Sequence, residues 1–358
     1  MTNQYTKDDT IFVQIASYRD PELQHTLQDL FQKAKKPANI FVGICHQYDM
    51  KGEEDKHLFE VPFPRQEQLR IDEVDYRKSE GCCWARNRVQ KLWKNEKWTL
   101  MIDSHMRFED GWDEMCVAAL KKLINCGVEK PILSHYPPGY DTVIESNGQC
   151  TTVYDSWLCR MRPEFRLFDN GNIPDLAQPP TIDYNHNFPL ITPVVGACFL
   201  FSKSCLNQEV IYDKHIYFSG EEISMSVRLW TSGYTIFCPN KIIVYHLWLT
   251  GKDKNGNKFQ DSNKHKKYSA LPNRLEQISY ARTKELFNTL KTNDPDALKE
   301  INQYGLGKSR ALKDYARFSG IDFRKKETRE HTKQGIFEEW QEVSKTKNLK
   351  NIFGRING

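Results

Sequence analysis

The sequence has no uninterrupted apolar run that approaches the roughly 18 residues needed to cross a bilayer, and its mean hydropathy is −0.68. These two features exclude a membrane span. The first ten residues, MTNQYTKDDT, do not place basic residues before an apolar run, so we expect no secretory signal in them. Internal repeats and low-complexity tracts are also absent. We therefore expect a soluble, folded protein.

The sequence also lacks the Cys-x-x-Cys pairs that are typical of structural zinc sites, although it contains ten cysteines. Several of these lie in apolar runs, such as Cys198 in VVGACFLF, where a free thiol behaves as a small hydrophobe. Reduced, buried thiols are typical of a reducing compartment. We therefore expect a cytoplasmic protein, and a zinc site is the less favoured interpretation.

The chain has 358 residues, of which 39% are hydrophobic and 12% aromatic. This length suffices for a substantial core, and so many aromatic side chains exclude an intrinsically disordered protein. At roughly 100–200 residues per domain, the length allows two domains, or one large domain with an appendage. Because residues 251–263 have the composition of a loop, we predict domains over 1–250 and 251–358, the second mostly helical.

The charge is uneven along the chain. Residues 251–358 contain 24 Lys and Arg against 14 Asp and Glu, whereas the first 250 residues contain 27 against 33. The basic side chains include two clusters, at Lys264, Lys266 and Lys267 and at Arg324, Lys325 and Lys326. A basic surface can attract nucleic acid, membranes or acidic proteins. Acidic residues are interleaved here and no nucleic-acid-binding motif is present, so we expect solvated helix faces and no nucleic-acid partner.

Strand-like and helix-like segments alternate in the first half of the chain. Apolar runs predict strands over residues 11–16, 39–45 and 98–102, and helical spacing predicts helices beginning near Pro21 and covering 82–93 and 112–125. This alternation predicts an α/β fold with a mainly parallel, doubly wound sheet. Ligands bind at the carboxyl ends of such strands. Polar clusters follow there, over residues 17–20, 46–49 and 103–105.

Residues 136–195 are rich in Pro, Gly, Asn and Asp and show little periodicity. We expect them to form a long irregular insertion, and such an insertion inside a compact domain is usually functional. We therefore expect it to lie near the active site.

The clearest motif is Asp103-Ser104-His105, directly after an apolar run. In extended chain, residues two apart point the same way, so the carboxylate and the imidazole converge. One oxygen and one nitrogen ligand suit a borderline divalent ion such as Mn²⁺. His246, at the end of another apolar run, could supply a third ligand. The alternatives are a hydrogen-bonded surface pair for Asp103 and His105 and a structural role for His246.

A second motif is Ser219-Gly220-Glu221-Glu222, at the start of a predicted helix. A carboxylate there could grip the hydroxyls of a sugar. The structural alternative is that Ser219 caps the helix and that the two acids interact favourably with the positive end of its dipole.

Together these segments resemble the nucleotide-sugar glycosyltransferases of the GT-A fold. The order Asp103-Ser104-His105, Glu221-Glu222 and His246 is similar to that in the polypeptide N-acetylgalactosaminyltransferases. The chain looks closer to glycosyltransferase family 60, which includes cytoplasmic enzymes that add N-acetylglucosamine to hydroxyproline. Further resemblances to that family are Gly81–Arg86, Asp103–Phe108, Gly111–Asp113, Tyr136-Pro137 and Ser319–Phe323. The resemblance extends from about Ile11 to Phe323 and implies a GT-A domain over residues 1–250.

The resemblance also implies roles for individual residues. Mn²⁺ would be held by Asp103, His105 and His246. The donor would be bound by Ser17, Tyr18, Arg19, Arg86, Asp103, Ser104, Gly220 and Glu221, the first three at the uridine. Glu221 aligns with an acid that binds sugar hydroxyls. Glu222 replaces the Asn of the galactosaminyl relatives and Phe218 replaces their Trp, so the role of Glu222 is open; in an inverting enzyme it would be the general base.

The implied function is a retaining, metal-dependent transfer of N-acetylglucosamine from UDP-GlcNAc to an acceptor hydroxyl, on protein hydroxyproline, Ser or Thr or on a glycan. One alternative is a transferase that uses another UDP-hexose to build a polysaccharide. The other is a non-catalytic binding module that holds a partner with its basic tail. A homodimer is also possible, because the apolar side chains of the C-terminal region could pack on a second copy as well as on the first domain. These are Leu275, Ile278, Leu286 and Leu290.

Overall fold

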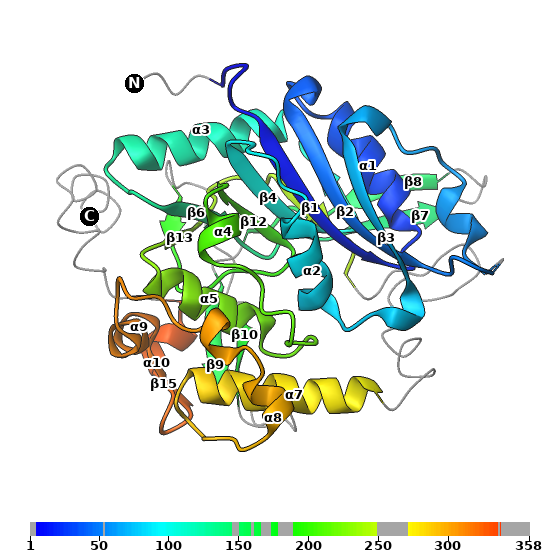
Figure 1. Cartoon of the computed structure of the whole chain (residues 1–358). Coiled ribbons are helices and arrows are strands. Elements are labelled where there is room, and N and C mark those ends of the chain that lie inside the picture. Colours follow the sequence, from blue (N-terminus) through cyan, green and yellow to red (C-terminus); the bar gives the residue numbers. More distant parts are fainter. Residues whose placement is uncertain are drawn as a thin grey trace.

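The computed structural model describes residues 5–52, 54–144, 150–158, 161–165, 173–177, 189–248, 271–335 and 337. Its centre is an eight-stranded sheet (Figure 1). The strands are β1 (Ile11–Tyr18), β2 (Ile40–Tyr48), β3 (Leu69–Asp75), β4 (Trp98–Asp103), β6 (Pro131–Ser134), β11 (Leu190–Ile191), β12 (Phe199–Lys203) and β13 (Thr235–Cys238). Their order is β11-β13-β6-β12-β4-β1-β2-β3.

The sheet is mixed. Strand β1 runs parallel to β2 and β4, β2 runs parallel to β3, and β6 runs parallel to β13. Strand β12 is antiparallel to both of its neighbours, β4 and β6, and β11 is antiparallel to β13. Four of these seven pairings are therefore parallel, and the predicted α/β class with a mainly parallel sheet is confirmed.

Helices cover both faces of the sheet. They are α1 (Glu22–Gln32), α2 (Cys82–Gln90), α3 (Trp112–Asn125), α4 (Leu206–Glu209) and α5 (Glu221–Thr231). Alternate residues of each strand point to opposite faces, so Leu100 and Ile102 pack with α1 and α3, whereas Met101 packs with α4 and α5. On that second face Phe12 packs with α2. The core therefore consists of two apolar layers separated by the sheet.

The predicted helix over residues 112–125 has those bounds in the structure. The helix predicted from Pro21 is α1, in which Leu23, Leu27 and Leu30 are buried. The helix predicted over residues 82–93 ends at Gln90 instead, because the chain tightens into shorter-range turns from Lys91 on. Sequence periodicity did not reveal β3, β6, β12 and β13. Three of these are only four or five residues long, and such short runs carry little periodic signal.

The interpretation of residues 136–195 as irregular is partly wrong. The described residues there form two antiparallel pairs, β7 (Tyr140–Ile144) with β8 (Cys150–Tyr154) and β9 (Arg162–Phe165) with β10 (Pro174–Ala177). Thr, Val and Tyr in the first pair favour strands, but the many turn-forming residues obscured them. Residues 145–149, 159–160, 166–172 and 178–188 of the insertion lie outside the described residues.

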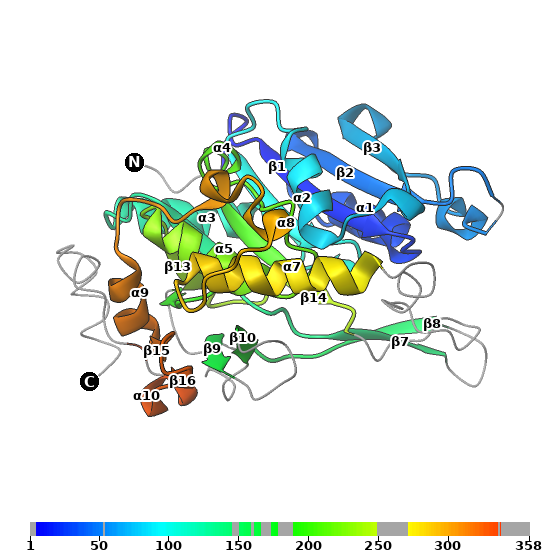
Figure 2. The same cartoon turned by 60° about the horizontal axis from the view of Figure 1, so that its bottom comes forward.

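The C-terminal region packs against the sheet domain. It contains α7 (Leu271–Leu286), α8 (Pro295–Leu298), a 3₁₀ helix (Ile301–Tyr304), α9 (Leu312–Ser319), β15 (Ile321–Asp322), β16 (Glu327–Thr328) and α10 (Glu330–Lys333). Helix α7 lies beside α8 in both views (Figures 1 and 2). Trp230 of α5 stacks on Phe318 of α9, with ring centroids 6.2 Å apart. The two parts share one apolar core, so the domain boundary near residue 250 stays a prediction.

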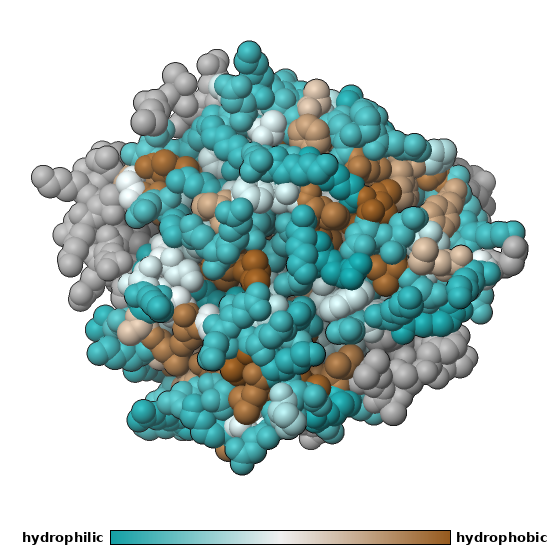
Figure 3. Space-filling model, in the orientation of Figure 1, coloured by the Kyte–Doolittle hydropathy of each residue, from teal (hydrophilic) through white to brown (hydrophobic). Residues whose placement is uncertain are grey.

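The apolar side chains predicted to pack in this region differ in burial. Ile278 is buried and Leu286 packs against the core, whereas Leu290 is 61% exposed. Arg324, Lys325 and Lys326 lie in the turn that joins β15 to β16. The other predicted basic cluster and the predicted loop over 251–263 lie outside the described residues. Hydrophilic residues cover most of the face in Figure 3, and within the described residues no helix combines the length and apolar character of a membrane span.

Helix α7 is joined to the sheet domain by a buried ion pair. The guanidinium of Arg282 donates to both carboxylate oxygens of Asp213, at 2.8–3.0 Å, and to the carbonyls of Ala297 and Lys299. Replacing Arg282 by Met leaves the buried Asp213 carboxylate without its charged partner. We expect the free energy of unfolding to fall by about 3–5 kcal/mol, as measured by urea denaturation.

Arg274 is the matched control, since it lies on the same helix and is paired with Asp294 and Asp296 at the surface. Exposed ion pairs contribute little, so Arg274→Met should leave the denaturation midpoint nearly unchanged. Equal losses in the two variants would contradict a special role for the buried pair.

Candidate active site

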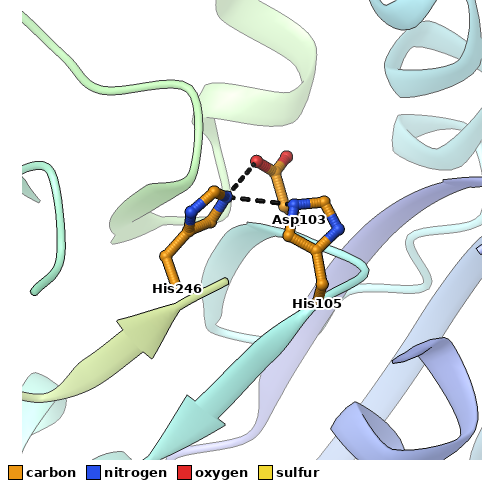
Figure 4. A group of neighbouring side chains, drawn as sticks. All are labelled: Asp103, His105 and His246. Carbon is orange, nitrogen blue, oxygen red and sulfur yellow. Dashed lines mark hydrogen bonds and ion pairs between the residues drawn. The ribbon is translucent and has the colours of Figure 1, made fainter. Parts of the chain in front are cut away.

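Three potential metal ligands meet at the end of β4. Asp103 is its last residue, and His105 follows in the turn that leads into β5 (Met106–Phe108). Strand β5 pairs with β14 (Val244–His246), which brings His246 opposite Met106. His246 Nε2 lies 3.1 Å from His105 Nε2 and 3.2 Å from Asp103 Oδ2 (Figure 4). The three ligand atoms all lie within 4.8 Å of one another.

This group fits a divalent cation. One carboxylate oxygen and two imidazole nitrogens suit a borderline ion such as Mn²⁺, and both histidines are buried. Burial lowers the pKa of His246, which favours the neutral ring that a metal requires. Burial acts to raise the pKa of Asp103, but Arg86, His246 and His105 together outweigh it, so the net shift is downward and the carboxylate stays ionised. The surface-pair alternative for Asp103 and His105 is wrong, since His105 is buried.

A carboxylate that sequence reasoning gave no role lies behind this group. Asp20 Oδ2 accepts a hydrogen bond from Nδ1 of His105, at 2.7 Å, and another from the hydroxyl of Ser104. Burial acts to lower the pKa of His105, but Asp20, with smaller contributions from Asp103 and Glu22, outweighs it and the net shift is upward. Asp20 belongs to the polar cluster at residues 17–20. Its position just after a predicted strand is the only sequence feature that indicates a role at the site.

Arg86 of α2 joins the metal motif to α5. Its guanidinium is buried and contacts Asp103 Oδ1 through Nη2 and Glu221 Oε1 through Nε, both at 2.7 Å. Nη2 also donates to the carbonyl of Ala197, at 2.9 Å. Burial raises the pKa of Glu221, although Arg86 opposes that shift. The predicted residues Arg86, Asp103 and Glu221 therefore lie in one cluster, and their contacts with a donor stay predictions.

Glu222, the next residue of α5, has different partners from Glu221. One oxygen accepts a hydrogen bond from the backbone N–H of Ala197, at 2.8 Å, and the other accepts the hydroxyl of Tyr136. Since both oxygens are engaged, the geometry favours a positioning role for Glu222. Its role as a general base stays a prediction.

The helix-capping alternative for Ser219 is wrong. Gly220, with φ of 91°, is the N-cap of α5 and makes no side-chain cap, and the Ser219 hydroxyl donates to Glu276 of α7 instead. A Cβ on Gly220 would come within 2.4 Å of Thr283 Oγ1. The α7 helix thus packs against the turn that precedes Glu221.

The first predicted donor-binding segment ends β1. Ser17 is fully buried, and the ring of Tyr18 packs edge-on against Tyr76. Arg19 has a left-handed backbone, with φ of 48°, and its guanidinium donates to both oxygens of Asp55 at 2.8–3.0 Å. It also lies over the Tyr76 ring. The Arg19 side chain is thus already paired with Asp55, and the contact of Arg19 with a uridine stays a prediction.

Comparison with solved structures identifies the class of fold. GalNAc-T7, in a crystal structure with UDP, GalNAc and Mn²⁺, has a TM-score of 0.52 and 16% identity, covering 82% of this chain and 54% of that one. Two others are S. aureus TarS in complex with UDP-GlcNAc and the mannosyltransferase PcManGT from Pyrobaculum calidifontis in complex with GDP-Man and Mn²⁺. TarS has a TM-score of 0.38 at 14% identity, covering 82% and 78% of the two chains. PcManGT has 0.44 at 10%, covering 84% and 70%.

The similarity to GalNAc-T7 confirms the predicted GT-A fold. The chain spans about half the length of GalNAc-T7. The Glycosyltransferase (GlcNAc) family model matches residues 10–61 and 49–325, and the chain belongs to that family. A search of curated proteins gave no match. The class of protein predicted from the sequence, a glycosyltransferase, is therefore confirmed.

The polar cluster at residues 46–49 does not join the metal group. The buried His46 packs among Tyr48, Phe59 and Phe63, with ring centroids 4.7–5.8 Å away. Its Nε2 has no hydrogen-bond partner in the part of the chain that the structure describes. Burial lowers the pKa of His46 to about 4. His46 is therefore neutral in the folded protein and belongs to an aromatic cluster.

This burial predicts a pH-dependent stability. Between pH 6.5 and 4 the unfolded chain binds a proton at His46 that the folded chain does not, so stability falls as the pH falls, by up to ~3 kcal/mol. His46→Phe should reduce the loss between pH 7 and pH 5, as measured by urea denaturation. An unchanged pH dependence in the variant would contradict this assignment.

Proposed function

We propose that the chain is a retaining, Mn²⁺-dependent glycosyltransferase that moves N-acetylglucosamine from UDP-GlcNAc to an acceptor hydroxyl. The observation that carries the proposal is the clustering of Asp103 with the buried His105 and His246 at the carboxyl end of a central strand. Ligands bind at this edge of α/β sheets. The family name and the UDP and Mn²⁺ in the GalNAc-T7 crystal structure support the donor class and the metal.

The metal would be held by Asp103, His105 and His246 and would neutralise the negative charge that develops on the departing diphosphate. Arg86 orients the two carboxylates, since it forms ion pairs with both Asp103 and Glu221. In this arrangement Glu221 is directed at the sugar hydroxyls, and Gly220 and Ser104 line the donor site beside it. Ser17, Tyr18 and Arg19 are assigned to the uridine.

The transfer breaks the bond between the anomeric carbon and the UDP oxygen and forms a bond from that carbon to the acceptor oxygen on the same face. The acceptor proton passes to the leaving phosphate, so no protein base is needed. The engagement of Glu222 by Tyr136 and Ala197 supports this route over inversion with Glu222 as the base.

The finer assignment is to glycosyltransferase family 60, with protein hydroxyproline, Ser or Thr or a glycan as acceptor. It rests on the sequence motifs. The cytoplasmic location and the homodimer also stay predictions.

The proposal is tested by measuring UDP release from a panel of UDP-sugars, in Mn²⁺ and then in EDTA, with water as the fallback acceptor. We expect Mn²⁺-dependent release from UDP-GlcNAc and little from other sugars. Release from another UDP-hexose would overturn the donor assignment and favour the alternative transferase. If no sugar is turned over and UDP with Mn²⁺ does not raise the melting temperature, the chain is the non-catalytic alternative.

Asp103→Asn removes the carboxylate charge at the metal but keeps its size. We expect turnover to fall on the order of 100-fold or more, because the charge on the departing diphosphate loses its partner. Mn²⁺-dependent UDP binding, measured by calorimetry, should be lost as well. Circular dichroism controls for folding, and a variant with full activity would remove the metal group from the proposal.

Glu221→Gln should lower turnover far more than UDP affinity, since its expected contact is with the sugar. Glu276→Gln is the comparison variant: that glutamate bonds Ser219 in the same loop from α7, so it shows how far a disturbance of the loop alone lowers turnover. Turnover and UDP affinity measured in parallel check the expectation. If UDP affinity falls as much as turnover in Glu221→Gln, the assigned contact is wrong.

A further inference from the structure

Asp20 occupies the junction between β1 and α1 and is only 6% exposed. Both of its carboxylate oxygens are engaged. Oδ1 accepts the backbone N–H of Glu22 at 2.9 Å, while Oδ2 accepts the Ser104 hydroxyl and lies 2.7 Å from Nδ1 of His105. Its hydrogen bonds thus run from the start of α1 to the Asp103–His105 turn.

The surrounding chain fixes Asp20 in this position. The left-handed backbone of Arg19 turns the chain sharply after β1, and the Arg19 N–H donates to the carbonyl of Gln47 at 2.8 Å. The Asp55 carboxylate holds the Arg19 side chain. From the next turn of α1, the Thr26 hydroxyl donates to the carbonyl of Ser104 and accepts the N–H of Met106. The start of α1 therefore holds the whole turn that carries His105.

A neutral imidazole carries one N–H, and only the other nitrogen can bind a metal. Because Asp20 accepts from Nδ1, the proton resides there and Nε2 keeps its lone pair. That lone pair faces His246 Nε2, at 3.1 Å, within the three-ligand group. Carboxylates that bond the far nitrogen of a ligating histidine typically contribute 10–100-fold to metal affinity.

We propose that Asp20 is a positioning residue for the metal: it fixes His105 as the Nδ1–H tautomer, so that Nε2 is held ready as a ligand. The inference rests on the proposed function, because it takes His105 as a ligand of the ion. Asp20 acts through His105 and Ser104 and does not itself belong to the ligand group.

Asp20→Asn tests the tautomer directly. If the new side-chain amide keeps its oxygen toward His105, its NH₂ group faces the backbone N–H of Glu22. Two hydrogen-bond donors then oppose each other, which is unfavourable. The flipped amide donates to Nδ1, which moves the imidazole proton to Nε2 and blocks the metal-binding nitrogen. Either arrangement disturbs His105, although the side-chain volume is unchanged.

Glu22→Gln is the matched control. Glu22 lies two residues along the chain and adds negative charge near His105, but its carboxylate bonds Arg107 and Tyr140, at 2.6 and 3.0 Å. It therefore separates the loss of a nearby charge from the loss of the hydrogen bond to His105.

The first measurement is the Mn²⁺ dissociation constant in the presence of UDP. The concentration of free Mn²⁺ is monitored by its electron paramagnetic resonance signal. We expect Asp20→Asn to weaken Mn²⁺ binding by about 10–100-fold, and Glu22→Gln to bind nearly as the unaltered protein does. Unchanged affinity in Asp20→Asn, or an equal loss in both variants, would overturn the inference.

The second measurement needs neither metal nor donor. In metal-free, ¹⁵N-histidine-labelled protein at alkaline pH, the nitrogen shifts of His105 should report a proton on Nδ1, and Asp20→Asn should change that signature. A proton on Nε2 in the unaltered protein overturns the inference even if the variant does not fold. If the unaltered protein shows the Nδ1 proton but binds no Mn²⁺, the metal-dependent function fails and the Asp20–His105 assignment survives.

Discussion

The site depends on one buried guanidinium, that of Arg86. Arg86 is 3% exposed and lies between two carboxylates, Asp103 at the end of β4 and Glu221 at the start of α5. A charge in this environment persists only because it is paired, and removing one partner of a buried ion pair is strongly destabilising. The pairing therefore fixes a strand, a helix start and the Ala197 backbone at a common point. The pairing, together with His246 and His105, also lowers the pKa of Asp103.

The loop before Glu221 is held from two directions. On one side, Cys82 at the start of α2 donates its N–H to the carbonyl of Tyr217, at 2.8 Å. On the other, α7 bonds the same loop, through Ser279 to the N–H of Tyr217 and through Glu276 to Ser219. The C-terminal region is thus part of the structure that positions Glu221. Its basic surplus is partly neutralised by local pairs, such as that of Arg274 with Asp294.

The sequence predicted those parts of the site that lie close together in the chain. Asp103 and His105 are two residues apart, and the alternation of side chains in a strand suffices to predict that they converge. His246 was suggested by its place after an apolar run and by family resemblance, but its position beside Asp103 and His105 could not be derived, since the β5–β14 pairing that places it is a long-range contact. The bonds of Asp20 to His105 and of Tyr136 to Glu222 could not be predicted, because they depend on how loops from different strands meet. The long helix α3 has a full periodic pattern, whereas four-residue strands such as β6 and β13 do not.

The third member of the Asp103–His105–His246 group comes late in the chain. His246 lies 141 residues after His105, an interval that a ribosome takes roughly 7–28 s to synthesise. Throughout that time a nascent chain offers only two of the three side chains. A complete cation site can therefore form only in a polypeptide that has been synthesised beyond β14 and in which β14 has paired with β5. Under the proposed function, retention of Mn²⁺ would therefore distinguish finished, folded molecules from truncated or misassembled ones.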